Sequence, residues 1–269
     1  MEQDNQNMLT FGGHLEVLRK MLFRILLLTL CFSIAVFCFK EQAFEILFAP
    51  SKWNFVTFDY IERFCALISV NFEFQEYNID LIATELSSQF MTHLTTSIYI
   101  GLLCASPYIM YELFRFISPA LYEDEKKYSV KVVLIVYALF ILGVLMSYFV
   151  IFPISFRFLG TYQVDEIVKN TITLNSYIST FTTLTLMMGV IFQLPVMAFF
   201  LAKLGVINSQ IMKAYRRHAF MLILIVASII TPPDIFTLIL VALPLYFLYE
   251  VSIKVVTAVR NKEQVENFD

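Results

Sequence analysis

The sequence predicts an all-α polytopic membrane protein with six transmembrane helices and both chain ends in the cytoplasm. Of its 269 residues, 59% are hydrophobic and only 15% are charged, and the mean hydropathy is +0.73. Soluble domains carry about 25% charged and about 45–50% apolar residues. The apolar residues gather in separate runs, and lysine and arginine are unevenly divided between the segments that join these runs. We therefore expect one integral membrane domain over residues 1–269.

Six apolar segments predict the spans, because a bilayer core about 30 Å thick needs about 20 helical residues. They are residues 21–39, 90–117, 132–152, 174–204, 219–230 and 235–251. The fifth and sixth are short, so they form either a re-entrant pair or two short crossings of a thinned bilayer. Pro107, Pro195 and Pro244 lie inside predicted spans, where proline bends a helix, and we expect a kinked, concave bundle.

The orientation follows from the excess of lysine and arginine in cytoplasmic segments. With the N-terminus inside, the inner segments hold 14 of the 19 lysines and arginines and the outer segments hold 5. Residues 40–89 then form the only long outer loop. It contains eight acidic residues interleaved with aromatic ones, a composition typical of a cap on the membrane surface.

Several classes of function are disfavoured. The three histidines share no metal-ligand spacing with each other or with the four cysteines, so we expect no metal site and no cofactor. There is no G-x-S-x-G motif and no phosphate-binding glycine loop, so we expect neither an enzyme nor an ATPase. The net charge of −3 does not suggest nucleic-acid binding.

Two inner segments carry clustered charge: His14–Arg19 at the start of the first span, and the loop after the second span with Glu123, Asp124 and Glu125. Either these are ordinary solvated interface charges, or the carboxylates form a site for a basic peptide. Carboxylates accept paired hydrogen bonds from guanidinium groups, which gives strength and selectivity. In the fourth span, Gln193 lies near Pro195. Its side chain either forms a structural hydrogen bond to a neighbouring helix or belongs to a functional polar patch.

The chain resembles the TatC family, the multispanning subunit of the twin-arginine (Sec-independent) protein translocase. The motif H-L-x-E-L-R is matched by His14–Arg19, and the proline after the first span by Pro50. Further matches follow in order: S-P-Y at 106–108, F-I-S-P-A-L-Y-E-D-E at 116–125, F-V-I-F-P at 149–153, F-Q-L-P-V at 192–196 and T-P-P-D at 231–234. They cover residues from about 11 to 255.

The resemblance implies a receptor that binds the twin-arginine signal peptides of folded precursors, assembles with TatA/TatB-type partners and further TatC copies in lipid, and uses the proton-motive force. It implies a bacterial inner membrane location. The implied signal-peptide residues are Glu125, Glu16, Arg19, Phe116, Pro119, Leu121 and Glu123. Pro50, Gln193, Pro195, Pro233, Asp234 and Tyr148 are implied to contact partners, to line the concave face or to support the structure.

The chain departs from the family pattern at three positions. The glutamate of the N-terminal motif falls at Val17, with Glu16 just before it. The fourth-span glutamate is Gln193, and a polar position after the aspartate of T-P-P-D is Leu238. The alternative function is a proton-coupled secondary transporter of a small solute. Such transporters show inverted repeats and charged pairs at the membrane midplane, and we find neither in the sequence.

Overall fold

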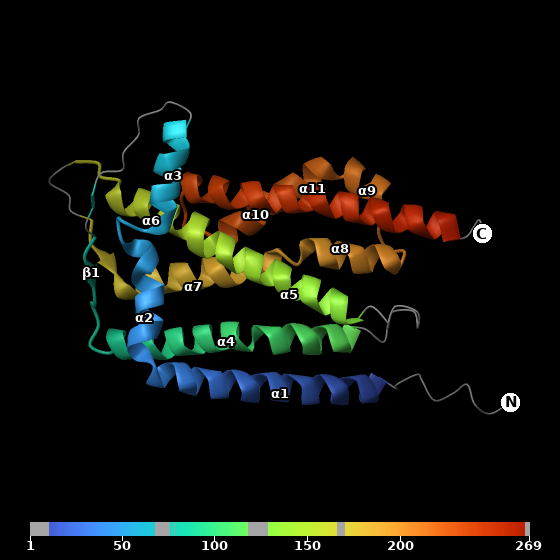
Figure 1. Cartoon of the computed structure of the whole chain (residues 1–269), viewed down its shortest axis with the longest axis horizontal. Helices are drawn as coiled ribbons and strands as arrows, with labels where there is room; N and C mark the ends of the chain where they lie inside the picture. Colours follow the sequence, from blue (N-terminus) through green and yellow to red (C-terminus); the bar gives the residue numbers. More distant parts are fainter. Residues whose placement is uncertain (1–10, 68–75, 78, 118–128, 166–169, 267–269) are drawn as a thin grey trace. The chain divides into compact units, whose positions relative to one another are not determined.

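The computed structural model describes residues 11–67, 76–77, 79–117, 129–165 and 170–266. These residues are mainly helical, with one parallel pair of two-residue strands, β1 (Leu81–Ile82) and β2 (Ile172–Thr173), in which Leu81 lies opposite Ile172 (Figure 1). The chain divides into two compact units. Unit 1 is Met1–Phe44 with Phe90–Tyr137, and unit 2 is Glu45–Gln89 with Ala138–Asp269.

The helices are α1 (Phe11–Cys38), α2 (Lys40–Phe48), α3 (Val56–Leu67), α4 (Ser88–Ile117), α5 (Ser129–Met146), α6 (Phe152–Thr161), α7 (Leu174–Ile191), α8 (Leu194–Lys203), α9 (Ser209–Ala214), α10 (Arg216–Ile230) and α11 (Ile235–Glu266). A 3-10 turn, η1 (Ala49–Ser51), follows α2, and a π-helical turn, η4 (Ser147–Ile151), joins α5 to α6.

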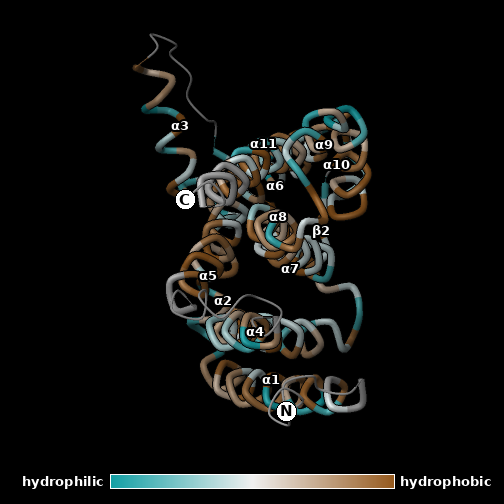
Figure 2. Tube along the Cα trace, turned by 90° about the vertical axis from the view of Figure 1, so that its right-hand side faces the viewer, coloured by the Kyte–Doolittle hydropathy of each residue, from teal (hydrophilic) through white to brown (hydrophobic). Residues whose placement is uncertain are grey.

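Five helical segments in the described residues are long and apolar enough to cross a membrane, so the chain is a multi-pass membrane protein. They are Leu15–Cys38, Ser88–Phe116, Val132–Thr161, Leu174–Lys203 and Ile235–Val259. Figure 2 shows this apolar character along α5. The remaining predicted span falls in α10, whose 15 residues extend about 22 Å. Six crossings, the N-in orientation and the concave bundle therefore stay predictions.

Two apolar helical segments extend beyond the spans that the sequence predicts. The third span was expected to end at residue 152, before Pro153, but its apolar helical segment continues to Thr161. Pro153 sits in the first two positions of α6, where a missing backbone N–H is tolerated. The last span was expected to end at residue 251, near Glu250. Its apolar segment extends to Val259, and Glu250 lies within α11, where it pairs with Arg216.

In unit 1, α1 and α4 lie side by side (Figure 1). Their backbones meet where Gly101 faces Ser33: a Cβ on Gly101 would lie 2.3 Å from Ser33 Oγ and 2.7 Å from its backbone nitrogen. Small residues allow this close approach between membrane helices. Further along the pair, the ring of His93 stacks on Phe37 with centroids 4.0 Å apart.

Unit 2 has an aromatic core between α6 and α7. The Phe152 ring meets Tyr177 and Phe181 edge-on, with centroids 5.1 and 4.9 Å away. Edge-to-face pairs of this kind add stabilisation beyond their buried area. In the same unit, α11 packs along α8 and α10.

The π-helical turn η4 is stabilised by a residue from another element. Pro153 supplies no N–H to the carbonyls one turn before it, and π turns already disturb the regular helical pairing. The Thr57 hydroxyl, from α3, donates a hydrogen bond to the Phe149 carbonyl. A carbonyl that the helix cannot satisfy therefore anchors the loop that follows the first span.

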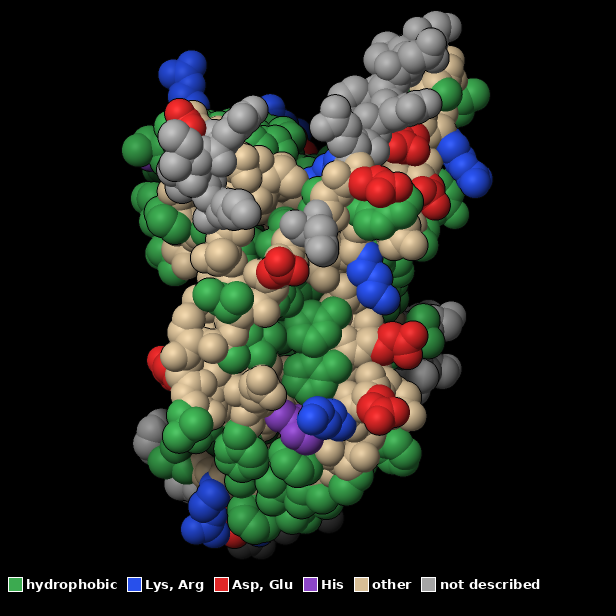
Figure 3. All heavy atoms as spheres, turned by 90° about the vertical axis from the view of Figure 1, so that its left-hand side faces the viewer, with side chains coloured by type: hydrophobic (Ala, Val, Ile, Leu, Met, Phe, Trp, Pro, Cys, Tyr) green, Lys and Arg blue, Asp and Glu red, His purple; other side chains and the backbone are tan. Residues whose placement is uncertain are grey.

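The predicted outer loop, residues 40–89, contains α2, η1, α3 and β1. Phe55 and Phe58 are buried, whereas Tyr60 and Phe64 are exposed. Charged side chains of both signs are scattered among apolar ones on the face of the molecule drawn in Figure 3. Phe55 and Phe58 therefore pack into the protein, whereas Tyr60 and Phe64 remain exposed and could contact the membrane surface on which the loop is predicted to lie.

Two tyrosine hydroxyls hold the end of α2. The Tyr177 hydroxyl donates to the Leu47 carbonyl and the Tyr148 hydroxyl donates to the Ile46 carbonyl, each over 2.8 Å. The Tyr177 bond is buried and the Tyr148 bond is exposed. The two bonds thus share donor type, acceptor type and length but differ in their access to solvent.

We expect Tyr177→Phe to lower the free energy of unfolding by about 1–3 kcal/mol, because it leaves a buried carbonyl without its donor. Tyr148→Phe should cost less, about 0.5 kcal/mol, since solvent replaces the lost bond. Thermal or denaturant unfolding of both variants in the same detergent measures the difference. Equal losses would show that burial does not set the cost.

Arg157 of α6 lies between two aromatic rings, with its guanidinium carbon 4.9 Å from the Phe58 ring centre and 4.8 Å from that of Tyr77. The buried Tyr77 hydroxyl makes no hydrogen bond within the described ranges. Burial raises the pKa of Tyr77 to about 12, although the positive charge of Arg157 opposes the shift. The ring of Tyr77, and not its hydroxyl, therefore makes the favourable contact.

Tyr77→Phe should leave stability near neutral pH unchanged or slightly higher, because it keeps the ring and removes an unpartnered hydroxyl. An unfolded tyrosine ionises near pH 10, whereas folded Tyr77 keeps its proton until about pH 12. Between these values Tyr77 therefore lowers the stability of the wild-type chain as the pH rises, and the variant lacks this contribution. Melting temperatures measured at about pH 8 and about pH 11 should diverge in favour of the variant; a constant difference would contradict the prediction.

Candidate functional site

The residues predicted to bind a signal peptide are divided by what the structure describes. Glu16 and Arg19 lie in the first turns of α1, and Phe116 is half-buried near the end of α4. Pro119, Leu121, Glu123 and Glu125 lie outside the described residues. The predicted carboxylate site in the loop after the second span therefore stays a proposal. The structure describes only the residues of α1 and α4 on either side of it.

Glu16 is already engaged by a neighbour. Its Oε1 lies 2.8 Å from Lys20 Nζ, one helical turn away, and both side chains are more than half exposed. An exposed pair at this spacing contributes little to stability, because solvent screens the two charges. Glu16 can exchange this partner at little cost, so it is available to a cationic ligand.

An open pocket of about 430 Å³ lies along the same side of α1. Its lining is Arg19, Lys20, Phe23 and Arg24. Three of these four side chains are cationic and the fourth is aromatic. The described lining of the pocket is therefore unfavourable for a guanidinium group, but a carboxylate lies beside it.

That carboxylate is Glu112 of α4, whose side chain is 4% exposed and lies within an apolar segment. Arg24 Nη1 lies 3.2 Å from Glu112 Oε1, and the Tyr108 hydroxyl donates to the same oxygen over 2.7 Å. Glu112 was not predicted as a site residue. A carboxylate inside a predicted span, one turn after Tyr108, was the available signal, because intramembrane charges are seldom without a function or a partner.

Tyr148 and Pro50 both belong to the region around the end of α2. Tyr148 binds the Ile46 carbonyl, and Pro50 is buried in η1. Contact with a partner, a place on the concave face and support of the structure were the roles predicted for Tyr148 and Pro50, and these contacts are structural. Contact with a partner stays a prediction.

Gln193 and Pro195 mark the break between α7 and α8. Gln193 is the N-cap residue of α8, and its carbonyl accepts from the Met197 amide over 2.9 Å. Pro195 is buried in the first turn of α8, where its missing N–H costs little. The predicted fourth span of residues 174–204 is therefore two helices, with Gln193 half-buried at the junction.

Asp234 caps α11. Its Oδ1 accepts from the Thr237 amide over 2.6 Å, the usual bond of an N-cap aspartate. Its second oxygen, Oδ2, is buried and accepts no hydrogen bond from any described residue. Pro233, just before it, is exposed. Of the roles predicted for Asp234, the geometry therefore supports the structural one, as the cap of α11.

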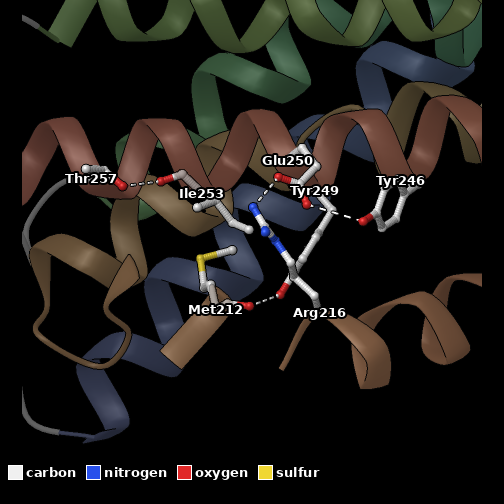
Figure 4. A network of polar contacts seen from close by, with 7 residues as sticks. All are labelled: Met212, Arg216, Tyr246, Tyr249, Glu250, Ile253 and Thr257. Atoms are coloured by element: carbon white, nitrogen blue, oxygen red, sulfur yellow. Dashed lines mark hydrogen bonds and ion pairs between the residues drawn. The ribbon is translucent and has the colours of Figure 1, made fainter. Parts of the chain in front are cut away.

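A second ion pair, also missed in the sequence, joins α10 to α11 (Figure 4). Arg216 Nη2 lies 2.8 Å from Glu250 Oε2, and the Tyr246 hydroxyl donates to Glu250 Oε1 over 3.3 Å. The Tyr249 hydroxyl donates to the Met212 carbonyl of α9 over 2.8 Å. These contacts fix the short helices α9 and α10 to one side of α11.

Nothing in the described part of the chain has the form of a metal centre. No three His, Cys, Asp or Glu side chains gather there, and the four cysteines are free thiols.

Comparison with known proteins gives one consistent result. Residues 13–244 match the family model for the Sec-independent protein translocase protein TatC. A TatC protein of Blattabacterium is 35% identical over 265 residues, covering 97% of this chain and all of the relative. A TatC protein of Desulforapulum autotrophicum is 32% identical and covers 90% of this chain and 82% of the relative. A crystal structure of the twin-arginine translocase receptor TatC superposes with a TM-score of 0.72 at 30% identity, covering 91% of this chain and 98% of that one.

Proposed function

Because the chain belongs to the TatC family of Sec-independent protein translocase proteins, we propose that it is the receptor subunit of a twin-arginine translocase. One observation carries the proposal: the solved structure that it resembles over nearly its whole length is that of a twin-arginine translocase receptor. The chain would sit in a bacterial inner membrane with both ends in the cytoplasm. It would bind the signal peptides of folded precursors at its cytoplasmic face.

The proposed signal-peptide site uses carboxylates, since a twin-arginine motif presents two guanidinium groups. Glu125 is its principal residue, with Glu16 in support and Glu123 nearby. Arg19 would orient the start of α1, and Phe116, Pro119 and Leu121 would supply apolar contacts beside the motif. The exposed and exchangeable Glu16–Lys20 pair supports the part given to Glu16.

Assembly with partners is proposed along the apolar faces of the spans. TatA/TatB-type single-span proteins and further TatC copies are the expected partners, with transport driven by the proton-motive force and no ATP hydrolysis by this subunit. The half-buried Gln193, at the junction of α7 and α8, would face the apolar part of the signal peptide or a partner helix.

Glu125→Ala should abolish crosslinking of the chain to a precursor that carries a twin-arginine signal, because the site loses its principal charge-assisted contact. The matched control is Asp124→Ala, which removes a neighbouring charge and should retain most of the crosslinking. Site-specific crosslinking in membrane vesicles measures both. Unchanged crosslinking by the Glu125 variant would remove Glu125 from the site.

A photoactivatable residue in place of Gln193 should capture the apolar part of a bound signal peptide or a single-span partner. The control position is Val190, which is exposed about one helical turn earlier and should capture lipid only. Mass spectrometry of the crosslinked products identifies what is captured. Capture of neither protein at position 193 would contradict the proposed contact.

A further inference from the structure

The side chain of Glu112 is more buried than those of Glu16 and Glu250, and a hydrogen bond from its own helix holds it in place. Its side chain is 4% exposed, and the Tyr108 hydroxyl holds it from one turn earlier on α4. Tyr108 and Arg24 both contact Oε1, and Oε2 takes part in neither contact. The carboxylate is therefore oriented by its own helix, with one oxygen not used by either neighbour.

Arg24, by contrast, is held loosely. Its side chain is 47% exposed, its contact with Glu112 is 3.2 Å long, and its Nε donates to the Lys20 carbonyl over 3.3 Å. It also lines the open pocket of about 430 Å³ beside α1. The guanidinium group can therefore leave Glu112 for this open space without disturbing the packing of α4.

We infer that Glu112 is a guanidinium-binding residue of the signal-peptide site, and that Arg24 is its resident occupant, displaced by an arginine of the incoming peptide. This inference rests on the proposed receptor function. Two arginines require two carboxylates, and the family glutamate of the N-terminal motif is Val17 here. Glu112, on the helix next to α1, supplies a carboxylate that the motif lacks.

The burial of Glu112 makes the exchange selective. A buried carboxylate without a partner is strongly destabilising, so Arg24 leaves only as another cation arrives. A guanidinium group can bond both carboxylate oxygens, including Oε2, whereas a lysine ammonium acts as a point charge. The site should therefore prefer an Arg-Arg peptide to a Lys-Lys peptide, and Arg24 should act as an internal competitor of the ligand.

The test is the binding of a fluorescent peptide containing the Arg-Arg motif to the full chain in detergent. Glu112→Gln should weaken binding by about tenfold or more, the loss expected for one charge-assisted bond. Arg24→Gln should strengthen binding several-fold, because the competitor is gone. The double variant should bind like Glu112→Gln alone.

Arg24→Gln leaves Glu112 without a cation, so the stability of each variant must be measured with and without peptide. We expect the Arg-Arg peptide to raise the melting temperature of Arg24→Gln more than that of the wild type, since the ligand replaces the missing cation. The double variant has two neutral amides and serves as a folded reference. The matched controls are Glu250→Gln and Arg216→Gln, which break an ion pair of similar arginine exposure and should not change peptide binding.

Each outcome decides between two claims. Normal binding by Glu112→Gln, with loss of binding by Glu125→Ala, would overturn the inference and leave the proposed function in place. Weaker binding by Arg24→Gln than by the wild type would make the pair a structural clamp, which also overturns the inference. Normal binding by both the Glu112 and the Glu125 variants would overturn the inference and place the site elsewhere on the chain, whereas no binding of the Arg-Arg peptide by the wild type would count against the receptor function itself.

Discussion

A polar group inside an apolar helix must find its partner within the protein, because lipid offers none. The departures from regular helix in this chain follow from that constraint. The carbonyl of Phe149 in the π turn is satisfied by the Thr57 hydroxyl, and the start of α11 by the Asp234 carboxylate. The end of α2 is held by Tyr148 and Tyr177. Side-chain partners, local at the start of α11 and distant in sequence at the π turn and at the end of α2, therefore satisfy the backbone where helices bend, begin and end.

The same constraint separates two ion pairs that look alike in sequence. The arginine side chains of Arg24–Glu112 and Arg216–Glu250 are almost equally exposed, at 47% and 46%. Their glutamates are not: Glu112 is 4% exposed and Glu250 is 29% exposed. Water and ions can replace the partner of Glu250, but only another cation can replace that of Glu112. Because the carboxylate of Glu112 is buried, its ion pair depends on which cation is present, whereas the more exposed pair of Glu250 does not.

Hydropathy and proline positions were sufficient to predict the helical membrane class, the location of five apolar segments and the break near Pro195. They could not show where a long-range partner changes the role of a residue. The helical segments continue past Pro153 and Glu250; the turn η4 precedes the first residue, and Arg216 pairs with the second. Glu112 was not predicted as a site residue. A hydropathy value averaged over a window of the sequence is lowered by the charge of Glu112. It cannot show that this charge pairs with Arg24, which lies 88 positions away in the sequence.

The same logic applies to the start of α1. The motif position at which the resemblance implies a glutamate is Val17, which is 39% exposed, so water would weaken a charge interaction there. Glu16 points about 100° away around the helix and pairs with Lys20. The carboxylate of Glu112 lies where the surroundings exclude water, so each interaction that it makes is stronger and its loss costs more. If the inference holds, the buried carboxylate of Glu112 adds selectivity for guanidinium groups to the carboxylates of the proposed site, provided that a resident cation stabilises it until the ligand arrives.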